Sequence, residues 1–249
     1  VALDNLGTFK PQGLANIVWA FAKMEASHPP LFEKVAYHIV ALDQLRAFKP
    51  QELTNIVWAF VKAEASHPAV LDKVADHIVA LDHLGTFNPQ DLANTVWAFA
   101  KMEVSNAPLF EKVADHTVAL DNLGAFKPQG LANIVWAFAK MEASHPPLFE
   151  KVAYHIVALD QLRAFKPQEL TNIVWAFVKA EASHPAVLDK VADHIVALDH
   201  LGTFNPQDLA NTVWAFAKME VSNAPLFEKV ADHTVALDNL GTFKPQGLA

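Results

Sequence analysis

A pattern of apolar and polar positions typical of an amphipathic α-helix starts at Pro11. Apolar residues recur at i, i+3, i+4, i+7 and i+8, namely Leu14, Ile17, Val18, Phe21 and Ala22, and this spacing places them on one helical face. A second apolar edge, formed by Ala15, Trp19 and Ala26, predicts that the helix is covered on two sides with Trp19 in the core. The alternative is that Trp19 and its counterparts stack on bases, as aromatic residues do in proteins that bind single strands. Proline suits the first helical turn, where its missing N–H costs nothing. The helix is predicted to end near Glu25 or Ala26.

A turn and a second helix follow this first helix. The turn is predicted at Ser27–Pro30, because the residue before a proline is disfavoured in helices while proline itself suits a helix start. The second apolar pattern reaches about Leu45 and consists of Leu31, Phe32, Val35, Ala36, Ile39, Val40, Leu42 and Leu45. The sequence contains no alternation typical of a strand. The unit is therefore predicted to be a hairpin of two helices.

The hairpin pattern returns with a period of 39 residues. All six tryptophans follow this spacing, at Trp19, Trp58, Trp97, Trp136, Trp175 and Trp214. A unit this short cannot bury its apolar face alone, so the repetition predicts an all-α fold, a right-handed α-solenoid of six tandem hairpins. We expect one array over residues 1–249, with repeats at about 9–47, 48–86, 87–125, 126–164, 165–203 and 204–242, and partial repeats at 1–8 and 243–249.

A longer period lies above the repeat. Residues 1–117 and 118–234 are identical except that Thr8 corresponds to Ala125, so three types of repeat occur twice in the same order. Recent tandem duplication and deliberate design both explain this near identity, and the sequence leaves both open.

The composition limits the classes of function. The net charge is −8, whereas nucleic-acid binding depends on neutralising phosphates, so any basic surface is expected to be local. The longest apolar run is far shorter than the ~20 residues of a membrane span, and no membrane association is expected. The chain has no cysteine, which excludes disulfides and thiolate sites. No targeting segment is recognisable, and we expect any such segment to lie outside this chain.

The first helix resembles the octotricopeptide repeat family. The resemblance is carried by PQGLANIVWAFAK at Pro11–Lys23 and PQELTNIVWAFVK at Pro50–Lys62, and more weakly by HPPLFEKVAYHI at His28–Ile39. It covers all six repeats, which are one residue longer than usual for that family. The resemblance implies an organellar α-solenoid, in a chloroplast or mitochondrion, that binds RNA at about one nucleotide per repeat and supports transcript stability, processing or translation.

Three polar positions of the first helix recur in every repeat and are candidates for RNA binding. Their members are the glutamines Gln12, Gln51, Gln90, Gln129, Gln168 and Gln207; the asparagines Asn16, Asn55, Asn94, Asn133, Asn172 and Asn211; and the lysines Lys23, Lys62, Lys101, Lys140, Lys179 and Lys218. All lie away from the main apolar stripe and are expected to line a concave surface. The alternatives are a structural amide ladder for the asparagines and a favourable interaction with the helix dipole for the lysines.

Positions that differ between repeat types are candidates for base selectivity. They fall at the start of the first helix, at Gly13, Glu52 and Asp91, and near the end of the second, at Asn5, Gln44 and His83. We expect the two places to lie close together at one edge of the stack. The alternative is that these are solvated helix ends that vary freely.

Catalysis and metal binding have little support in the sequence. His38, His77 and His116 are one repeat apart, about a helix diameter of ~10 Å, whereas zinc ligands lie within ~2.1 Å of the ion. No phosphate-binding loop, nucleophile motif or convincing carboxylate pair is present. The chain is therefore expected not to be an enzyme and to use no cofactor, metal or small-molecule substrate.

The sequence supports the hypothesis that the chain binds single-stranded RNA non-catalytically and selectively along its concave face. The order of the three repeat types predicts a preference for a trinucleotide written twice. The alternatives are a solenoid that binds protein or peptide partners, an architectural scaffold with end-to-end self-association, and an idealised array without a natural ligand.

Overall fold

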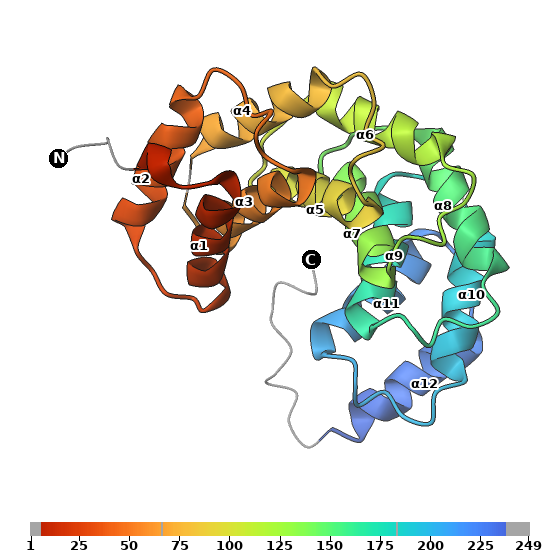
Figure 1. Cartoon of the computed structure of the whole chain (residues 1–249). Helices are drawn as coiled ribbons and strands as arrows, with labels where there is room; N and C mark the ends of the chain where they lie inside the picture. The colour runs from red at the N-terminus through yellow and green to blue at the C-terminus, as the bar shows by residue number, and fades with distance from the viewer. Residues whose placement is uncertain (1–5, 66, 183, 238–249) are drawn as a thin grey trace. The chain divides into compact units, whose positions relative to one another are not determined.

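The computed structural model describes residues 6–65, 67–182 and 184–237. Within these ranges the chain forms twelve α-helices and one short 3-10 turn, and no strand (Figure 1). The helices pack in regular succession as an α-solenoid of two-helix repeats, which confirms the predicted fold class. The chain divides into two compact units, residues 1–119 and 120–249.

Each unit contains three hairpins in two layers. In the first unit the helices are η1 Leu6–Thr8, α1 Pro11–Lys23, α2 Pro29–Ala41, α3 Pro50–Lys62, α4 Pro68–Val79, α5 Pro89–Lys101 and α6 Ala107–Ala119. In the second they are α7 Pro128–Lys140, α8 Pro146–Ala158, α9 Pro167–Lys179, α10 Pro185–Val196, α11 Pro206–Lys218 and α12 Ala224–Val235.

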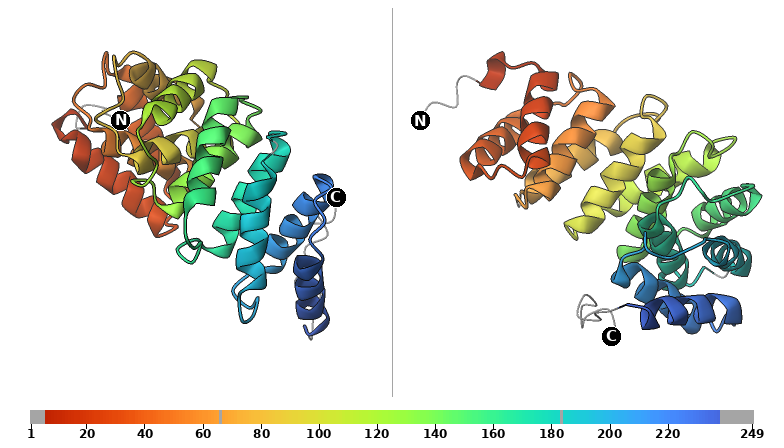
Figure 2. Two further views of the ribbon diagram at one scale, coloured as in Figure 1. Left: turned by 90° about the vertical axis from the view of Figure 1, so that its right-hand side faces the viewer. Right: turned by 90° about the horizontal axis from the view of Figure 1, so that it is seen from below.

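The first helix of each hairpin packs on first helices and the second on second helices. In the first unit α3 lies between α1 and α5, and α4 lies between α2 and α6; in the second unit α9 and α10 take the corresponding central places (Figure 2). A central first helix therefore has neighbours on both sides and its own partner helix behind it. One stripe of its surface is left for solvent.

Proline lies in the first turn of the helices, as predicted, and side chains cap the helix starts in three ways. Asn88 Oδ1 accepts a hydrogen bond from the Asp91 backbone N–H at 2.8 Å, as expected for an N-cap asparagine. At the start of α3, where lysine precedes the proline and a glutamate follows, Glu52 Oε2 accepts a hydrogen bond from the Lys49 N–H at 2.8 Å. The turn histidine His28 also acts as a cap, since its Nδ1 accepts from the Leu31 N–H at 3.2 Å.

The first helices end earlier than predicted, in a tight turn with a left-handed glutamate. α1 ends at Lys23 and Glu25 has φ 52°; the corresponding glutamate of every repeat has φ between 51° and 55°. The Ala26 N–H bonds to the Phe21 carbonyl at 3.0 Å and the Glu25 N–H to the Ala22 carbonyl at 3.2 Å, the pairing of a Schellman motif. Glycine is usual at this position, because a side chain is disfavoured at positive φ.

The second helices are also shorter than predicted: α2 ends at Ala41 and not near Leu45. Leu45 and Phe48 are buried, but they enter the core from the connecting loop, and the apolar pattern alone did not distinguish these arrangements. The freed carbonyls at helix ends are bound by a lysine of the following second helix. Lys112 Nζ donates to the carbonyls of Val79, at 2.7 Å, and Leu81.

The core between neighbouring repeats combines aromatic contacts with one buried polar junction. The rings of Phe32 in α2 and Phe60 in α3 pack edge to face, with their centroids 5.3 Å apart. At the junction of α3 and α5 the hydroxyls of Thr54 and Thr95 are 3.2 Å apart and share a hydrogen bond. Thr95 also donates to the Asp91 carbonyl at 2.8 Å. The same threonine junction, Thr171 with Thr212, occurs in the second unit.

Candidate nucleic-acid interface

The central first helices expose a single stripe of side chains. Beyond Pro50, the residues of α3 that are not buried are Gln51, Asn55, Trp58 and Lys62, at i, i+4, i+7 and i+11. This spacing puts them on one side of the helix. In the second unit, the corresponding residues of α9 are Gln168, Asn172, Trp175 and Lys179. We call this surface the Gln-Asn-Trp-Lys face.

Within each unit, the recurrent glutamines, asparagines and lysines take the corresponding positions on the packed first helices. The side chains at these three positions are at least partly exposed in all six first helices, as expected for residues away from the apolar stripe. The full set of recurrent members is Gln12, Asn16, Lys23, Gln51, Asn55, Lys62, Gln90, Asn94, Lys101, Gln129, Asn133, Lys140, Gln168, Asn172, Lys179, Gln207, Asn211 and Lys218. Their role in RNA binding stays a prediction.

The tryptophans differ from the expectation of a core position. Trp58 and Trp175 are only half-buried, and Trp19 is 40% exposed. Trp19 and Trp58 contact each other with ring centroids 6.3 Å apart and planes tilted by 35°, and Trp136 and Trp175 repeat this contact. The sequence contained the signal, because each tryptophan follows an asparagine by three residues and precedes a lysine by four, which places all three on one side of a helix.

The amides of this face form hydrogen bonds along their own helix. Gln90 Nε2 donates to Asn94 Oδ1 at 3.0 Å, and Gln207 Nε2 donates to Asn211 Oδ1 at 2.8 Å. Gln90 Oε1 is shielded from solvent and has no hydrogen-bond partner among the described residues. Leaving a buried acceptor unpaired costs about 1–3 kcal/mol.

Two lysines of the face are paired with the left-handed glutamates. Lys62 Nζ is 2.8 Å from Glu25 Oε1, and Lys179 Nζ is 2.7 Å from Glu142 Oε1. The hydrogen bond and the charge of each lysine lower the pKa of the glutamate it contacts. Both lysines remain partly exposed, at 43% and 41%. Their charge is thus shared with an acid of the preceding repeat.

The variable positions at the start of the first helix are mostly buried. Glu52 is 9% exposed and Asp91 is 7% exposed; both lie at the helix start, where Glu52 caps its helix. Burial raises the pKa of Asp91 above its ordinary value, and hydrogen bonds from Asn88 oppose this rise. Gly13 is partly exposed. This placement favours a structural role for the two acids and leaves base selectivity there a prediction.

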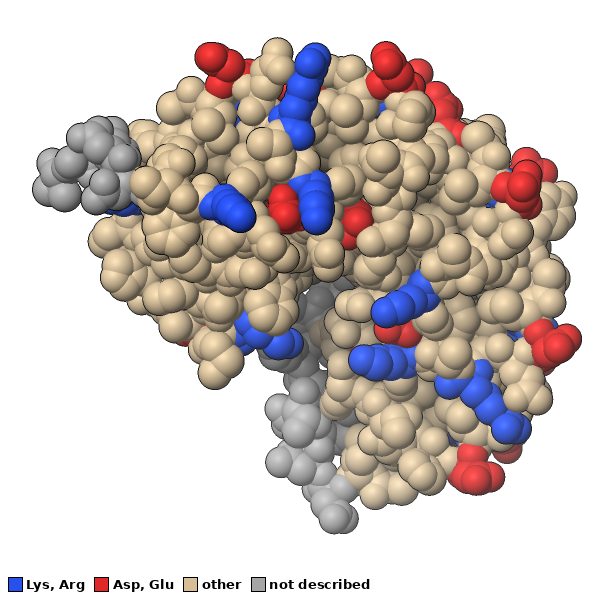
Figure 3. Space-filling view, viewed as in Figure 1, with Lys and Arg blue, Asp and Glu red and all other residues tan. Residues whose placement is uncertain are grey.

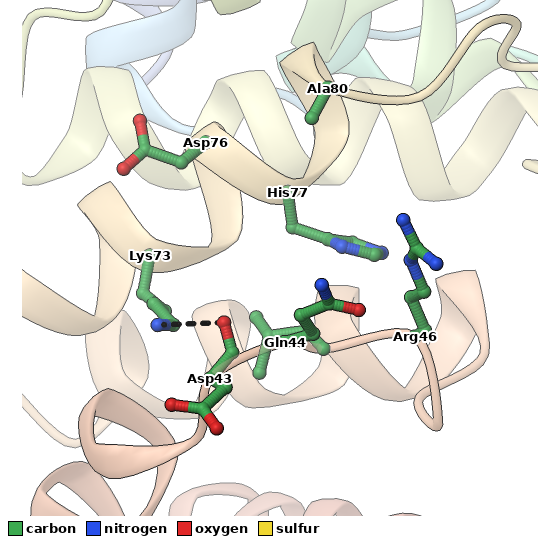
Figure 4. A pocket seen from close by; sticks show the side chains of 8 residues that line it. Asp43, Gln44, Arg46, Lys73, Asp76, His77 and Ala80 are labelled. Atoms are coloured by element: carbon green, nitrogen blue, oxygen red, sulfur yellow. Dashed lines mark hydrogen bonds between the residues drawn. The ribbon is translucent and has the colours of Figure 1, made fainter.

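The second variable position lies in the loop that follows each second helix. Gln44 lines a cavity of about 320 Å³ together with Arg46 of the same loop and Lys73 and His77 of α4 (Figure 4). Burial and the charge of Arg46 lower the pKa of His77. None of the residues that line this cavity comes from a first helix. His83 is exposed and accepts from the Gly85 N–H at 3.3 Å, while Asn5 lies outside the described residues.

Acidic side chains gather on the opposite layer. One exposed acid recurs at the same place in the second helices, at Glu33, Asp72, Glu111, Glu150, Asp189 and Glu228. Figure 3 shows acidic residues along the edge of each unit where its second helices lie, with many lysines and arginines set further in. The net negative charge of the whole chain is therefore not the charge of the Gln-Asn-Trp-Lys face, which consists of amide, aromatic and lysine side chains.

Two negative observations apply to the described part of the chain. None of its helices is long and apolar enough to cross a membrane. Within the same ranges, histidine, aspartate and glutamate side chains do not gather in groups of three that could hold a metal ion.

The sequence matches the model of a known protein family. A family model described as RNA-editing substrate-binding complex 6 protein matches residues 8–236. No curated protein matches the sequence.

Proposed function

The chain belongs to the RNA-editing substrate-binding complex 6 family, and from this premise we propose that it binds single-stranded RNA without catalysing a reaction. The binding surface in this proposal is the Gln-Asn-Trp-Lys face of the first helices. Within each unit, the RNA in this proposal runs along the layer of first helices, one repeat after another.

One observation carries the proposal: the surface of a central first helix is restricted to four residue types that together suit single-stranded RNA. Amides hydrogen-bond to base edges, aromatic rings and cations recur in proteins that bind single strands, and lysines neutralise phosphates. In α3 every other position beyond Pro50 is buried. The period of 39 residues then repeats the same groups along the stack.

Sequence selectivity forms the finer part of the proposal. The frame of the face is constant, so selectivity must come from positions that differ between repeat types. The exposed loop residues Gln44 and His83 are better placed for this than the buried Glu52 and Asp91. The order of the repeat types predicts preference for a trinucleotide written twice, and exchanging the loop residues between repeats is expected to move that preference.

The family description also supports assembly with protein partners and an organellar location. RNA-editing complexes of this kind are mitochondrial, and the proposal therefore favours the mitochondrion over the chloroplast. A second function, binding of basic protein partners, is supported by the exposed acids of the second helices. It is tested by titration with an arginine-rich peptide: charge reversal at Glu111 and Glu150 should weaken binding, and unchanged binding would exclude this surface.

The RNA proposal is tested by selection from a pool of random single-stranded RNA, with affinity followed across salt concentration. The expected result is saturable binding, an affinity that falls as salt rises because counterions are released from phosphates, and enrichment of a three-base period. Absence of binding at low salt, where attraction between charges is screened least, would refute RNA binding. Binding without any enrichment would refute selectivity alone.

A further inference from the structure

We propose that the exposed tryptophans form base-stacking platforms on this surface, one in each unit, with Trp58 and Trp175 as their rings from the central first helices. This inference rests on the proposed RNA binding and assigns the groups that take up the bases. Each platform is a pair of rings from neighbouring repeats, Trp19 with Trp58 in the first unit and Trp136 with Trp175 in the second.

The burial of the rings supports this role. A tryptophan that served only the core would be covered, as Phe60 and Phe177 are in the same helices. Trp58 and Trp175 instead keep part of the ring in solvent even in the central helix of each unit. An indole that remains partly exposed in the middle of a packed layer is accessible to a ligand.

The ring pairs also hold the platform in a fixed orientation. The centroids of both pairs are 6.3 Å apart, and the planes are tilted by 35° and 33°, within the range of favourable aromatic contacts. A side chain that is already held in place loses less conformational freedom when a base binds.

The ion pairs of the face leave room for a contribution from stacking. Lys62 and Lys179, the lysines of the central first helices, already contact glutamates. The attraction of these two lysines to phosphates is therefore weakened. Stacking on an aromatic ring does not depend on charge and accepts every base, so it supplies the affinity that the lysines lack.

The inference is tested with two matched double variants, Trp58→Leu with Trp175→Leu, and Trp58→Phe with Trp175→Phe. Leucine keeps apolar bulk for packing but removes the ring, whereas phenylalanine keeps a ring. The probes are a fluorescein-labelled pool of random single-stranded RNA and an oligonucleotide of the same length without bases. Circular dichroism and thermal unfolding establish that each variant is folded.

The leucine variant is expected to bind the RNA pool about five- to hundredfold more weakly, the effect of losing base–aromatic stacking. Its affinity for the abasic strand and its salt dependence should stay unchanged, because neither depends on stacking. The phenylalanine variant should retain most of the affinity. Tryptophan fluorescence of the unaltered chain should be quenched by the RNA pool and much less by the abasic strand.

The outcomes separate this inference from the RNA proposal. If the unaltered chain binds the RNA pool and the leucine variant binds equally well, the stacking role is refuted while RNA binding stands. If the leucine variant does not fold, binding by the unaltered chain without quenching of its tryptophan fluorescence refutes the role. If the unaltered chain binds no RNA, both proposals fail together.

Discussion

The ion pairs between first helices lead to a prediction about the strength of RNA binding. Glu25 contacts Lys62 and Glu142 contacts Lys179, each within 2.8 Å. A glutamate in this position competes with an RNA phosphate for the lysine. Replacing both glutamates in a Glu25→Gln and Glu142→Gln variant should free the two lysines without changing the size of the side chains.

The expected magnitude follows from the number of lysines freed. Each additional phosphate contact to a single strand steepens the dependence of log affinity on log salt by about 0.7. Two freed lysines should therefore steepen the slope by about 1.4. When the salt concentration is lowered fourfold, the affinity of the variant divided by that of the unaltered chain should therefore rise about sevenfold.

Fluorescence anisotropy with labelled single-stranded RNA, over a series of salt concentrations, measures this slope directly. The matched control is Glu64→Gln with Glu181→Gln. These glutamates have the same left-handed backbone, with φ of 51° at both positions, but form no ion pair within the described residues. The control removes the same charge, so it corrects for the change in net charge.

If the Glu25→Gln and Glu142→Gln variant has the slope of its control, then the lysines either already reach phosphates in the unaltered chain or do not contact RNA. A Lys62→Ala and Lys179→Ala variant separates these two cases. The log affinity of this variant should depend less steeply on log salt than that of the unaltered chain only if the lysines contact phosphate.

Three further predictions concern stability. Glu64→Gly should raise the free energy of unfolding by about 0.5–1 kcal/mol in denaturant titrations, because glycine adopts positive φ without strain, whereas Glu64→Ala should give no such gain. Lys112→Met should lower it by about 1–3 kcal/mol by removing a charged donor from the carbonyls at the end of α4; an unchanged midpoint would contradict this role. Burial lowers the pKa of four histidines in the second helices, namely His77, His116, His155 and His194. The unfolded chain therefore binds more protons than the folded chain, and stability should fall as the pH decreases below the ordinary histidine pKa of 6.5. In thermal melts between about pH 7.5 and 5.5, the melting temperature should depend less on pH when all four histidines are replaced by glutamine.

The helical hairpins could be predicted because apolar periodicity and proline positions agree in every repeat. The helix ends could not be predicted as well, since different local rules compete there. Leu42 and Leu45 continue the apolar pattern of α2, yet the helix stops at Ala41 and Leu45 reaches the core from a loop. Glu25 gives no sign of the left-handed turn, because the residue usual at that position is glycine.

The candidate site was predictable in its polar residues and not in its aromatic ones. Gln51, Asn55 and Lys62 were placed by their distance from the apolar stripe. Trp58 was assigned to the core because tryptophan is apolar, although its spacing from Asn55 and Lys62 puts it on the same side of α3. Glu52 shows the opposite error: an acidic residue was expected at the surface, but the helix start buries it as a cap.

The buried threonine junction constrains the order in which repeats can follow one another. Thr54 shares its hydrogen bond with Thr95, whereas the other two repeat types carry isoleucine, Ile17 and Ile56, at the position of Thr95. Exchanging the third repeat for either of the others would leave the Thr54 hydroxyl without this partner. The repeats are therefore not interchangeable modules. A duplication of 117 residues keeps the two threonines as neighbours, and recombination of arrays like this one would conserve function best when its breakpoints avoid the junction of α3 and α5.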